Sequence, residues 1–261
     1  MDTFQLYKDM KARTNGEIYI GVVGPVRTGK STFIKRFMDL LVLPNMTDEH
    51  AKARTKDELP QSASGTTIMT TEPKFVPKEA AEISLAEDVT VKVRLIDCVG
   101  FMVEGASGHI ENDVERQVKT PWFEYEIPFT KAASIGTQKV IHEHSTIGIV
   151  VTTDGSIGNL PRDSYVEAEE KTIHELQSIG KPFVLLVNCK KPYSEEAKNL
   201  AESLQEKYQT AALAVNCEQM KAEDVHRIMQ QVLYEFPISE VEFYIPKWVE
   251  MLSRDHVIKQ D

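Results

Sequence analysis

The fold of this chain is decided by one stretch, Gly24-Pro25-Val26-Arg27-Thr28-Gly29-Lys30-Ser31, which matches the pattern G-x-x-x-x-G-K-[ST] in full. Residues 17–23 before it read as a buried strand, and residues 32–41 after it have the apolar spacing of a helix. A strand, a glycine-rich loop and a helix N-terminus in this order place several backbone N–H groups around one phosphate chain. Because both flanks fit, a chance match in a turn is a poor explanation. The stretch therefore predicts a P-loop that binds a nucleoside triphosphate.

Individual residues of the predicted P-loop have separate roles. Lys30 would reach the β- and γ-phosphates, and the Ser31 hydroxyl would bind Mg²⁺. Arg27 either adds positive charge near the phosphates or faces solvent, and both placements fit the sequence. The residues of this segment that are expected to contact the nucleotide are Gly24, Arg27, Thr28, Gly29, Lys30, Ser31 and Thr32.

The composition is that of a globular protein. The 261 residues are 41% hydrophobic and 27% charged, which suits one large α/β domain with or without a small appendage. With 40 acidic and 30 basic residues the formal net charge is −10, and broad nucleic-acid binding needs a basic surface instead. No nucleic-acid partner is therefore predicted.

The N-terminus, the apolar runs and the cysteines indicate the compartment. Residues 1–4 lead into no apolar core, so no signal peptide is expected. The longest apolar runs, such as residues 183–187, have the length of strands, so any membrane association would be peripheral. Cys98, Cys189 and Cys217 are odd in number and lack metal-ligand spacing, which favours a reduced, cytoplasmic setting.

Strand-like and helix-like segments alternate along the chain. This alternation predicts an α/β fold, a three-layer P-loop NTPase with a mostly parallel sheet and helices on both faces. The NTPase domain is expected over residues 1–236, with an irregular insert at about 101–130, and residues 237–261 are expected to start a following, truncated segment. The aromatic run at 120–125 would be either a self-association surface or a flap pinned to the core. Residues 44–67 are polar and are expected to be exposed and mobile.

A second motif follows a predicted strand over residues 89–96. Asp97-Cys98-Val99-Gly100 has the form D-x-x-G. An acid at the C-terminal end of a strand beside a P-loop is where P-loop enzymes hold Mg²⁺. We therefore expect Asp97 to act in catalysis and metal binding, and the Gly100 backbone N–H to contact the γ-phosphate.

A threonine-rich loop lies between the first helix of the predicted domain and a predicted edge strand. Residues 73–77 begin and end with proline, which cannot donate to a sheet ladder and so suits an edge. A loop in this position carries, in nucleotide-hydrolysing switches, a threonine that senses Mg²⁺ and the γ-phosphate. The spacing leaves open whether this role belongs to Thr66 and Thr67 or to Thr70 and Thr71.

Together these features resemble the translation-factor-related branch of P-loop GTPases, with two departures. That branch reads guanine with [NT]-K-x-D, and this chain has Asn188-Cys189-Lys190-Lys191 instead. Asn188 is still expected to contact the nucleotide, but Lys191 offers no acceptor to the N–H groups of guanine, so ATP is the predicted substrate. Phe101 stands where a water-orienting glutamine is common, so hydrolysis should be slow until self-association or a partner completes the site.

Longer strings resemble one family in particular. Besides the P-loop segment, they are Glu58-Leu59-Pro60-Gln61-Ser62, residues 67–75, residues 144–148 and Pro246-Lys247-Trp248-Val249. On these strings, which are spread over nearly the whole chain, the sequence is similar to the stage IV sporulation protein A family. Its members are morphogenetic ATPases of endospore-forming bacteria.

This resemblance implies Lys30 as the Walker A lysine, Asp97 as the Walker B acid, and Thr70 and Thr71 as sensor threonines. Mg²⁺ would be bound by Ser31, Asp97 and Thr70, partly through water. ATP hydrolysis would drive assembly into a static polymer, the base layer of the spore coat, at the outer forespore membrane in the mother-cell cytoplasm.

The resemblance also implies a set of partners. These are further copies of the chain, a small amphipathic membrane-anchoring sporulation peptide and other spore coat morphogenetic proteins. Membrane contact would come only through these partners or through regions outside this chain.

Two other functions remain open on the sequence. A regulatory or ribosome-assembly GTPase of the same branch would prefer GTP, whereas a nucleotide-binding scaffold would release no phosphate. The aromatic side chain at Phe101 keeps the scaffold hypothesis in view.

Overall fold

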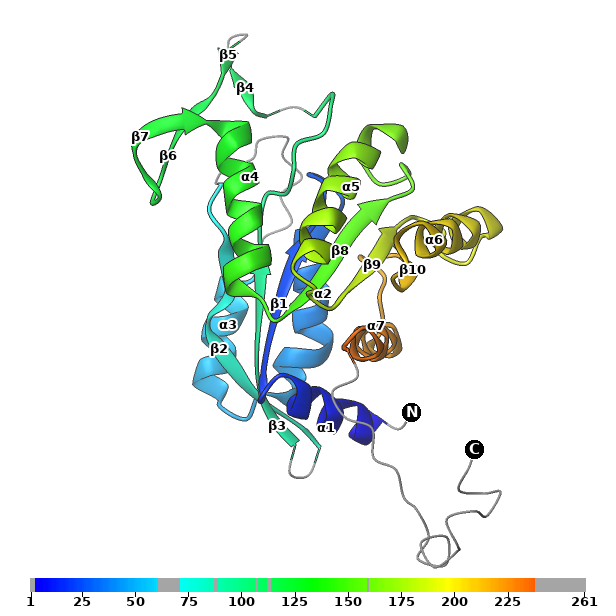
Figure 1. The fold of residues 1–261 in the computed structure, drawn as a ribbon. Coiled ribbons are helices and arrows are strands. Elements are labelled where there is room, and N and C mark those ends of the chain that lie inside the picture. Colours follow the sequence, from blue (N-terminus) through cyan, green and yellow to red (C-terminus); the bar gives the residue numbers. More distant parts are fainter. Residues whose placement is uncertain are drawn as a thin grey trace, which may run out of the picture.

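A six-stranded sheet organises the chain in a computed structural model that describes residues 3–60, 71–86, 89–106, 108–111, 114–158 and 160–237 (Figure 1). The strand order is β10-β9-β8-β1-β3-β2, and every neighbouring pair is parallel except β2 with β3. The strands are β1 (Glu17–Val23), β2 (Lys74–Ala86), β3 (Val89–Asp97), β8 (Ile147–Thr153), β9 (Phe183–Asn188) and β10 (Ala212–Val215). The predicted α/β fold with a mostly parallel sheet is confirmed.

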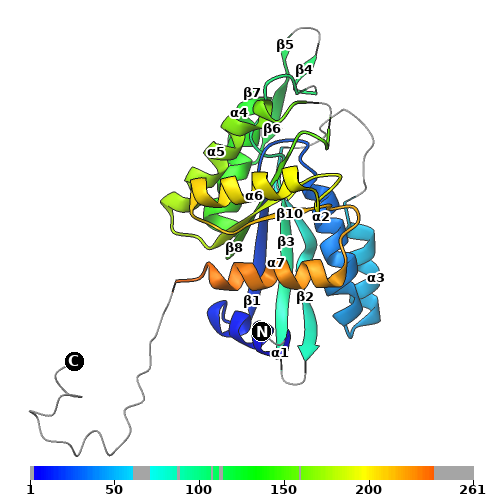
Figure 2. The same cartoon turned by 90° about the vertical axis from the view of Figure 1, so that its right-hand side faces the viewer.

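Helices cover both faces of the sheet (Figure 2). The α1, α2, α3 and α7 helices lie on one face, and α4, α5 and α6 lie on the other. Short helical turns, η1 and η3, continue α2 and α4. The bounds are α1 (Thr3–Arg13), α2 (Lys30–Phe37), η1 (Met38–Val42), η2 (Leu43–Asn45), α3 (Glu49–Glu58), α4 (Phe129–Lys139), η3 (Val140–His144), α5 (Asp163–Ser178), α6 (Glu195–Tyr208) and α7 (Ala222–Tyr234).

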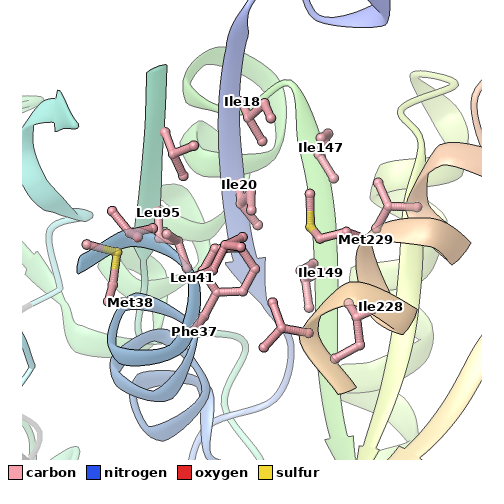
Figure 3. Close-up of a cluster of buried hydrophobic side chains, with 14 of the residues drawn as sticks. Ile18, Ile20, Phe37, Met38, Leu41, Leu95, Ile147, Ile149, Ile228 and Met229 are labelled. Carbon is pink, nitrogen blue, oxygen red and sulfur yellow. The ribbon is translucent and has the colours of Figure 1, made fainter. Parts of the chain in front are cut away.

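The strands β8 and β9 are nearly continuous, fully buried apolar runs because both of their faces are covered. Side chains of β1, β3 and β8 meet α2 and α7 on one face, as Figure 3 shows for Ile20, Ile149 and Phe37. Residues of opposite orientation on the same strands, such as Ile96 and Val150, pack against the helices of the other face. Every residue of β8 is buried. These two apolar layers fix the orientation of each strand about its axis.

The parallel register brings the C-terminal ends of the central strands to one edge. Val22 on β1 is level with Asp97 at the end of β3, and Asn188 at the end of β9 is level with Thr153 and Val215. The loops that follow these strands therefore meet at one end of the sheet. In open α/β sheets, ligands bind at this end.

The segment that precedes β2 contains a helix that the sequence analysis did not predict. Residues 44–67 were expected to be exposed and mobile. Over Glu49–Glu58 they form the regular helix α3, whose residues are exposed or half-buried except for Thr55. The Asp48 carboxylate caps α3 by accepting hydrogen bonds from the backbone N–H groups of His50 and Ala51. Residues 61–67 lie outside the described part of the chain.

The predicted edge strand is confirmed, but β2 runs past Pro77 to Ala86. Pairing with β3 shifts register between Val76 and Ala81, where the missing N–H of Pro77 is accommodated. The outer side of β2 is covered by the preceding segment: Met46 forms a bridge with Ile83, and the Lys78 N–H donates to Glu58 Oε2 at 2.8 Å.

The predicted insert is more regular than expected. It contains two antiparallel hairpins, β4 (Ile110–Glu111) with β5 (Val114–Glu115) and β6 (Gln117–Thr120) with β7 (Phe123–Pro128), and in both views they extend away from the sheet (Figures 1 and 2). The ring of Trp122 lies over Lys139 on α4, whereas Tyr125 is 63% exposed. The aromatic run therefore both packs on the domain and presents a ring to solvent.

The helices and the three cysteines bear on the compartment of the protein. None of the helices in the described ranges is both long enough and apolar enough to cross a membrane. Cys98, Cys189 and Cys217 are buried free thiols. The predicted following segment, from residue 238 onward, lies outside the described residues.

Candidate nucleotide-binding site

The segment between β1 and α2 folds as a tight loop. Gly24 and Gly29 have φ of 132° and 95°, and Arg27 adopts a left-handed φ of 63°. The Thr28 hydroxyl, fully buried, donates to Pro25 O at 3.1 Å and so braces the loop from within. The α2 helix starts at Lys30, which leaves its first N–H groups free to face an anion in front of the loop.

Lys30 curls back over this loop. Its side chain is only 5% exposed, and Nζ donates to Pro25 O at 2.5 Å and to Gly24 O at 3.4 Å. Burial lowers the pKa of Lys30, while the neighbouring Cys98 and Asp97 raise it. A cation held this close to the loop backbone is placed to contact phosphates bound there.

Ser31 and Asp97, the two predicted metal ligands described by the structure, are in contact. Ser31 Oγ donates to Asp97 Oδ2 at 2.6 Å, while Asp97 Oδ1 is buried and has no hydrogen-bond partner among the described residues. Burial raises the pKa of Asp97, and the Ser31 hydrogen bond and the charges of Lys30 and Lys74 oppose this rise. A buried carboxylate oxygen without a partner, next to a hydroxyl, fits the hard oxygen ligation that Mg²⁺ requires.

The D-x-x-G segment lies against the P-loop at very short range. A Cβ on Gly100, whose φ is 94°, would lie 2.0 Å from Gly24 O and 2.8 Å from Lys30 Nζ. Only glycine fits there, because any other residue would collide with the loop backbone. One residue later, Phe101 O accepts a hydrogen bond from Val26 N at 3.0 Å. The close contact at Gly100 and this hydrogen bond hold the D-x-x-G segment against the P-loop.

The Phe101 side chain faces away from the polar residues of the site. Its ring is 3% exposed and belongs to an apolar cluster between the P-loop and α5, formed by Val26, Phe101, Val103, Ala106, Tyr165 and Ala168. Lys171 Nζ lies 4.4 Å from the ring centroid. The sequence indicates only that Phe101 cannot hydrogen-bond a water, whereas in the structure its ring packs in this apolar cluster.

Asn188 links two loops of the site. Its Nδ2 donates to Thr28 O at 2.9 Å, and its Oδ1 accepts from Cys217 N at 3.0 Å. Both ends of the amide are thus engaged by the protein, so that Asn188 holds the P-loop to the loop after β10. Its predicted contact with the nucleotide stays a prediction.

Residues that sequence analysis missed complete this end of the sheet. Ser156 Oγ donates to Asp154 Oδ1 at 2.6 Å and accepts from Lys190 N at 3.0 Å, and Asn216 Nδ2 donates to Lys190 O at 3.4 Å. These residues could have been found from the sequence because Asp154 and Ser156 follow β8 and Asn216 follows β10, and loops after parallel strands share one edge of the sheet. They fix the backbone of the loop that carries Lys191.

The threonine loop is described only from Thr71, and Thr70, Thr66 and Thr67 lie outside the described residues. Thr71 is 4% exposed, and its carbonyl oxygen lies 2.6 Å from the point that a Cβ on Gly136 of α4 would occupy. Trp122 of the insert lies 3.4 Å from the same point. Within the described ranges, Thr71 makes no hydrogen bond to Ser31 or Asp97, so its predicted sensor role stays a prediction.

Comparison with known proteins identifies the domain. The family described as "Stage IV sporulation protein A, ATPase domain" matches residues 1–237. The chain belongs to the stage IV sporulation protein A family. The resemblance found in the sequence is thereby confirmed, and the family description supports an ATPase activity and nucleotide binding in general terms.

Curated members of the stage IV sporulation protein A family are similar over the whole chain. The Bacillus subtilis (strain 168) protein is 50% identical over 260 residues, which cover 100% of this chain and 53% of that relative. The Clostridioides difficile (strain 630) protein is 54% identical over 254 residues, which cover 97% of this chain and 52% of that relative. The chain thus spans about half the length of these stage IV sporulation protein A relatives.

Proposed function

We propose that this domain hydrolyses ATP at the P-loop, and that hydrolysis drives assembly of copies of the chain into a static polymer. In this proposal the polymer is the base layer of the spore coat, built at the outer forespore membrane in the mother-cell cytoplasm. The observation that carries the ATPase assignment is the Lys30, Ser31 and Asp97 arrangement, in which a buried carboxylate oxygen lacks a partner among the described residues. The family description supports the same activity.

The reaction needs charge stabilisation around the triphosphate. Water adds to the γ-phosphorus, the bond to the β–γ bridging oxygen breaks, and ADP and phosphate leave. Lys30 and the N–H groups at the start of α2 would bind the phosphate oxygens. Ser31 Oγ and Asp97 would hold Mg²⁺, and by resemblance Thr70 would be a further ligand. When bound, this ion neutralises the negative charge that develops on the phosphates.

The segment Asn188-Cys189-Lys190-Lys191, which stands where related GTPases recognise guanine, supports ATP as the substrate. Guanine presents N–H groups that an aspartate would accept, and this chain has Lys191 in the place of that aspartate. A site built to pair with guanine loses selectivity by orders of magnitude when such a partner is missing.

Turnover is expected to be slow in the isolated domain. The Phe101 ring is buried against α5 and has no group that could orient the attacking water. Assembly would then speed the reaction if a neighbouring copy supplied the missing group. By resemblance, the assembly would also involve a small amphipathic anchoring peptide and other coat morphogenetic proteins.

Steady-state hydrolysis of ATP and GTP, measured across protein concentration, tests the proposal. We expect phosphate release from ATP in preference to GTP, with a specific activity that rises with protein concentration. Lys30→Ala should abolish release, whereas Lys35→Ala, which changes an exposed lysine on the same helix, should leave it unchanged.

Each opposite result points to a different function. A clear preference for GTP would support the GTPase hypothesis. Nucleotide binding without Lys30-dependent phosphate release would support the scaffold. A specific activity independent of concentration would contradict completion of the site by self-association.

A further inference from the structure

Lys74, the first residue of β2, stands next to Asp97 in the sheet. In the antiparallel ladder of β2 and β3 the two residues are register partners. Directly opposed residues in such a ladder point to the same face of the sheet, with Cβ atoms about 4.5–5.5 Å apart. The Lys74 side chain therefore leaves the sheet on the same face as the Asp97 carboxylate.

The face that carries both side chains is the one that α2 covers. Val76 and Leu95, each two residues from the pair along their strands, are buried in the apolar layer that includes side chains of α2. Residues two apart in a strand share a face. The hydrogen bond from Ser31 Oγ to Asp97 Oδ2 places the carboxylate on the α2 side as well. Lys74 is thus on the P-loop side of the sheet, at the end where the loops meet.

The Lys74 side chain is exposed, and its ammonium group forms no hydrogen bond or ion pair with the described residues. It nevertheless lies within electrostatic range of the site: burial raises the pKa of Asp97, and the charge of Lys74 is among the interactions that oppose this rise. The other nearby cation, Lys30, is different, because its Nζ already donates to Gly24 O and Pro25 O in the P-loop. Lys74 is therefore a cation beside the site whose charge the described part of the protein does not pair.

The arrangement of the strands shows which phosphate Lys74 would meet. The P-loop follows β1, Asp97 ends β3 and Lys74 starts β2, so these parts lie in the order β1-β3-β2 along one end of the sheet (Figure 1). In a P-loop the backbone N–H groups cradle the α- and β-phosphates, and the lysine reaches the β- and γ-phosphates. The segment after β3 lies beside that lysine, since a Cβ on Gly100 would be 2.8 Å from Lys30 Nζ. The γ-phosphate is therefore the phosphate nearest to the ends of β3 and β2.

We propose that Lys74 is a second phosphate-binding cation, whose ammonium group contacts the γ-phosphate of a bound nucleoside triphosphate from the β2 side of Asp97. Lysine has a flexible aliphatic stem and a compact charge, so the ammonium group can move from solvent to a phosphate oxygen while the sheet stays in place. In the bound state Lys74 and Lys30 would neutralise the γ-phosphate from two directions. Charge stabilisation of this kind is the main contribution of a protein to phosphoryl transfer.

This inference rests on the proposed triphosphate binding, but it does not depend on hydrolysis or on the base. It predicts that Lys74 makes the site prefer a triphosphate to a diphosphate, because a diphosphate has no γ-phosphate for the ammonium group to contact. A lysine that acted only through the charge of Asp97 would not do so, since Asp97 is expected to hold Mg²⁺ with either nucleotide.

The test compares Lys74→Met with Lys92→Met, a matched control on the neighbouring strand. Lys92 is an exposed lysine of β3, and Val91 and Val93 on either side of it are buried in the layer under α2. Its side chain therefore points to the opposite face of the sheet. Both substitutions remove one exposed positive charge, but only the first removes it beside the P-loop.

Calorimetry with Mg²⁺ measures the binding of ADP, of the β,γ-imido analogue of ATP and of the corresponding guanine nucleotides. In Lys74→Met we expect the triphosphate analogue of the preferred base to bind about tenfold more weakly, the usual effect of losing a charged hydrogen bond. The diphosphate should bind within about twofold of the parent. Lys92→Met should change neither affinity.

Contrary results separate this inference from the proposed function. Equal triphosphate affinity of Lys74→Met and the parent would overturn the contact, as would an equal loss for triphosphate and diphosphate or an equal loss in Lys92→Met. A parent that prefers guanine nucleotides, or that binds without hydrolysis, would overturn the ATPase proposal while the loss specific to the triphosphate still stands. A parent that binds neither kind of nucleotide would overturn both.

Discussion

The P-loop is flanked by two regions, one polar and one apolar, that differ in how well their groups are satisfied by contacts within the protein. Its polar side, defined here as Ser31, Lys74 and Asp97, contains a buried carboxylate oxygen without a partner among the described residues. Its apolar side, defined as Val26, Phe101 and Tyr165, is a buried cluster to which α5 contributes Tyr165. The polar side contains a buried oxygen that a cation could bind, whereas the side chains of the apolar side are already packed against one another. From this difference we expect that the rate of hydrolysis depends on the polar side, whereas the stability of the folded domain depends on the apolar side.

The largest expected effect is on the polar side. Asp97→Asn should lower ATP hydrolysis about a thousandfold, because loss of metal-assisted charge stabilisation of about 4 kcal/mol raises the barrier by that factor. The same substitution should stabilise the protein without nucleotide, because it removes a buried charge. Phosphate release and urea unfolding check the two effects, with Asp57→Asn, at an exposed position, as the control. Loss of activity together with loss of stability would indicate misfolding instead.

The pH dependence of the free energy of unfolding provides a second test of the polar side. Burial raises the pKa of Asp97 in the folded, metal-free protein above its value in the unfolded chain. At pH values between these two pKa values, the folded state therefore binds more protons than the unfolded state. The contribution of Asp97 to the free energy of unfolding should therefore fall as pH rises through this window and stay low above it. Urea unfolding at several pH values should show this decline in the parent and a smaller decline in Asp97→Asn. An identical decline in both would contradict the assignment.

The next effect concerns the apolar side. Phe101→Ala should destabilise the domain by about 3–5 kcal/mol, the usual cost of truncating a buried phenylalanine, and should change hydrolysis per folded molecule only a few-fold. Phe101→Leu, the volume-conserving control, should cost under about 1.5 kcal/mol. Urea unfolding and phosphate release below the unfolding midpoint measure both quantities. A thousandfold loss of hydrolysis in stable Phe101→Leu would show that the ring itself acts in the reaction.

The smallest effect is expected where α4 meets the threonine loop. A Cβ at Gly136 would lie 2.6 Å from the Thr71 carbonyl, so Gly136→Ala should displace Thr71 and lower hydrolysis several-fold while ATP affinity stays within about twofold of the parent. Ser134→Ala on the same helix is the control. Single-turnover hydrolysis and calorimetry separate the two quantities. Unchanged hydrolysis in Gly136→Ala would place Thr71 outside the reacting site.

Much of the fold could be predicted because its signals are local. The P-loop pattern, the apolar strands and the helix spacing each lie within about ten residues, and they fixed the sheet and the end at which its loops meet. The α3 helix was missed because it is polar and short, and its main signal is the single capping residue Asp48. The insert hairpins were missed because two of their strands are only two residues long.

The site was harder to predict where contacts join distant segments. Ser31 and Asp97 were paired through a known motif, but the contacts of Asn188 with Thr28 and Cys217 depend on three loops in space. The direction of the Phe101 ring likewise depends on α5, which lies more than sixty residues later. Chain topology, and not local pattern, decides these contacts.

The covered edge at β2 limits how copies of the domain can associate. Pro77 has no N–H to donate, Ile83 is bridged by Met46, and the Lys78 N–H is taken by Glu58. An open strand would offer its ladder to any similar strand, including one from a misfolded neighbour. Since this ladder is already occupied at these points, copies that assemble as proposed would have to meet at this edge through side-chain surfaces, whose contacts can discriminate one partner from another. The coverage of this strand thus disfavours edge-to-edge aggregation of the domain.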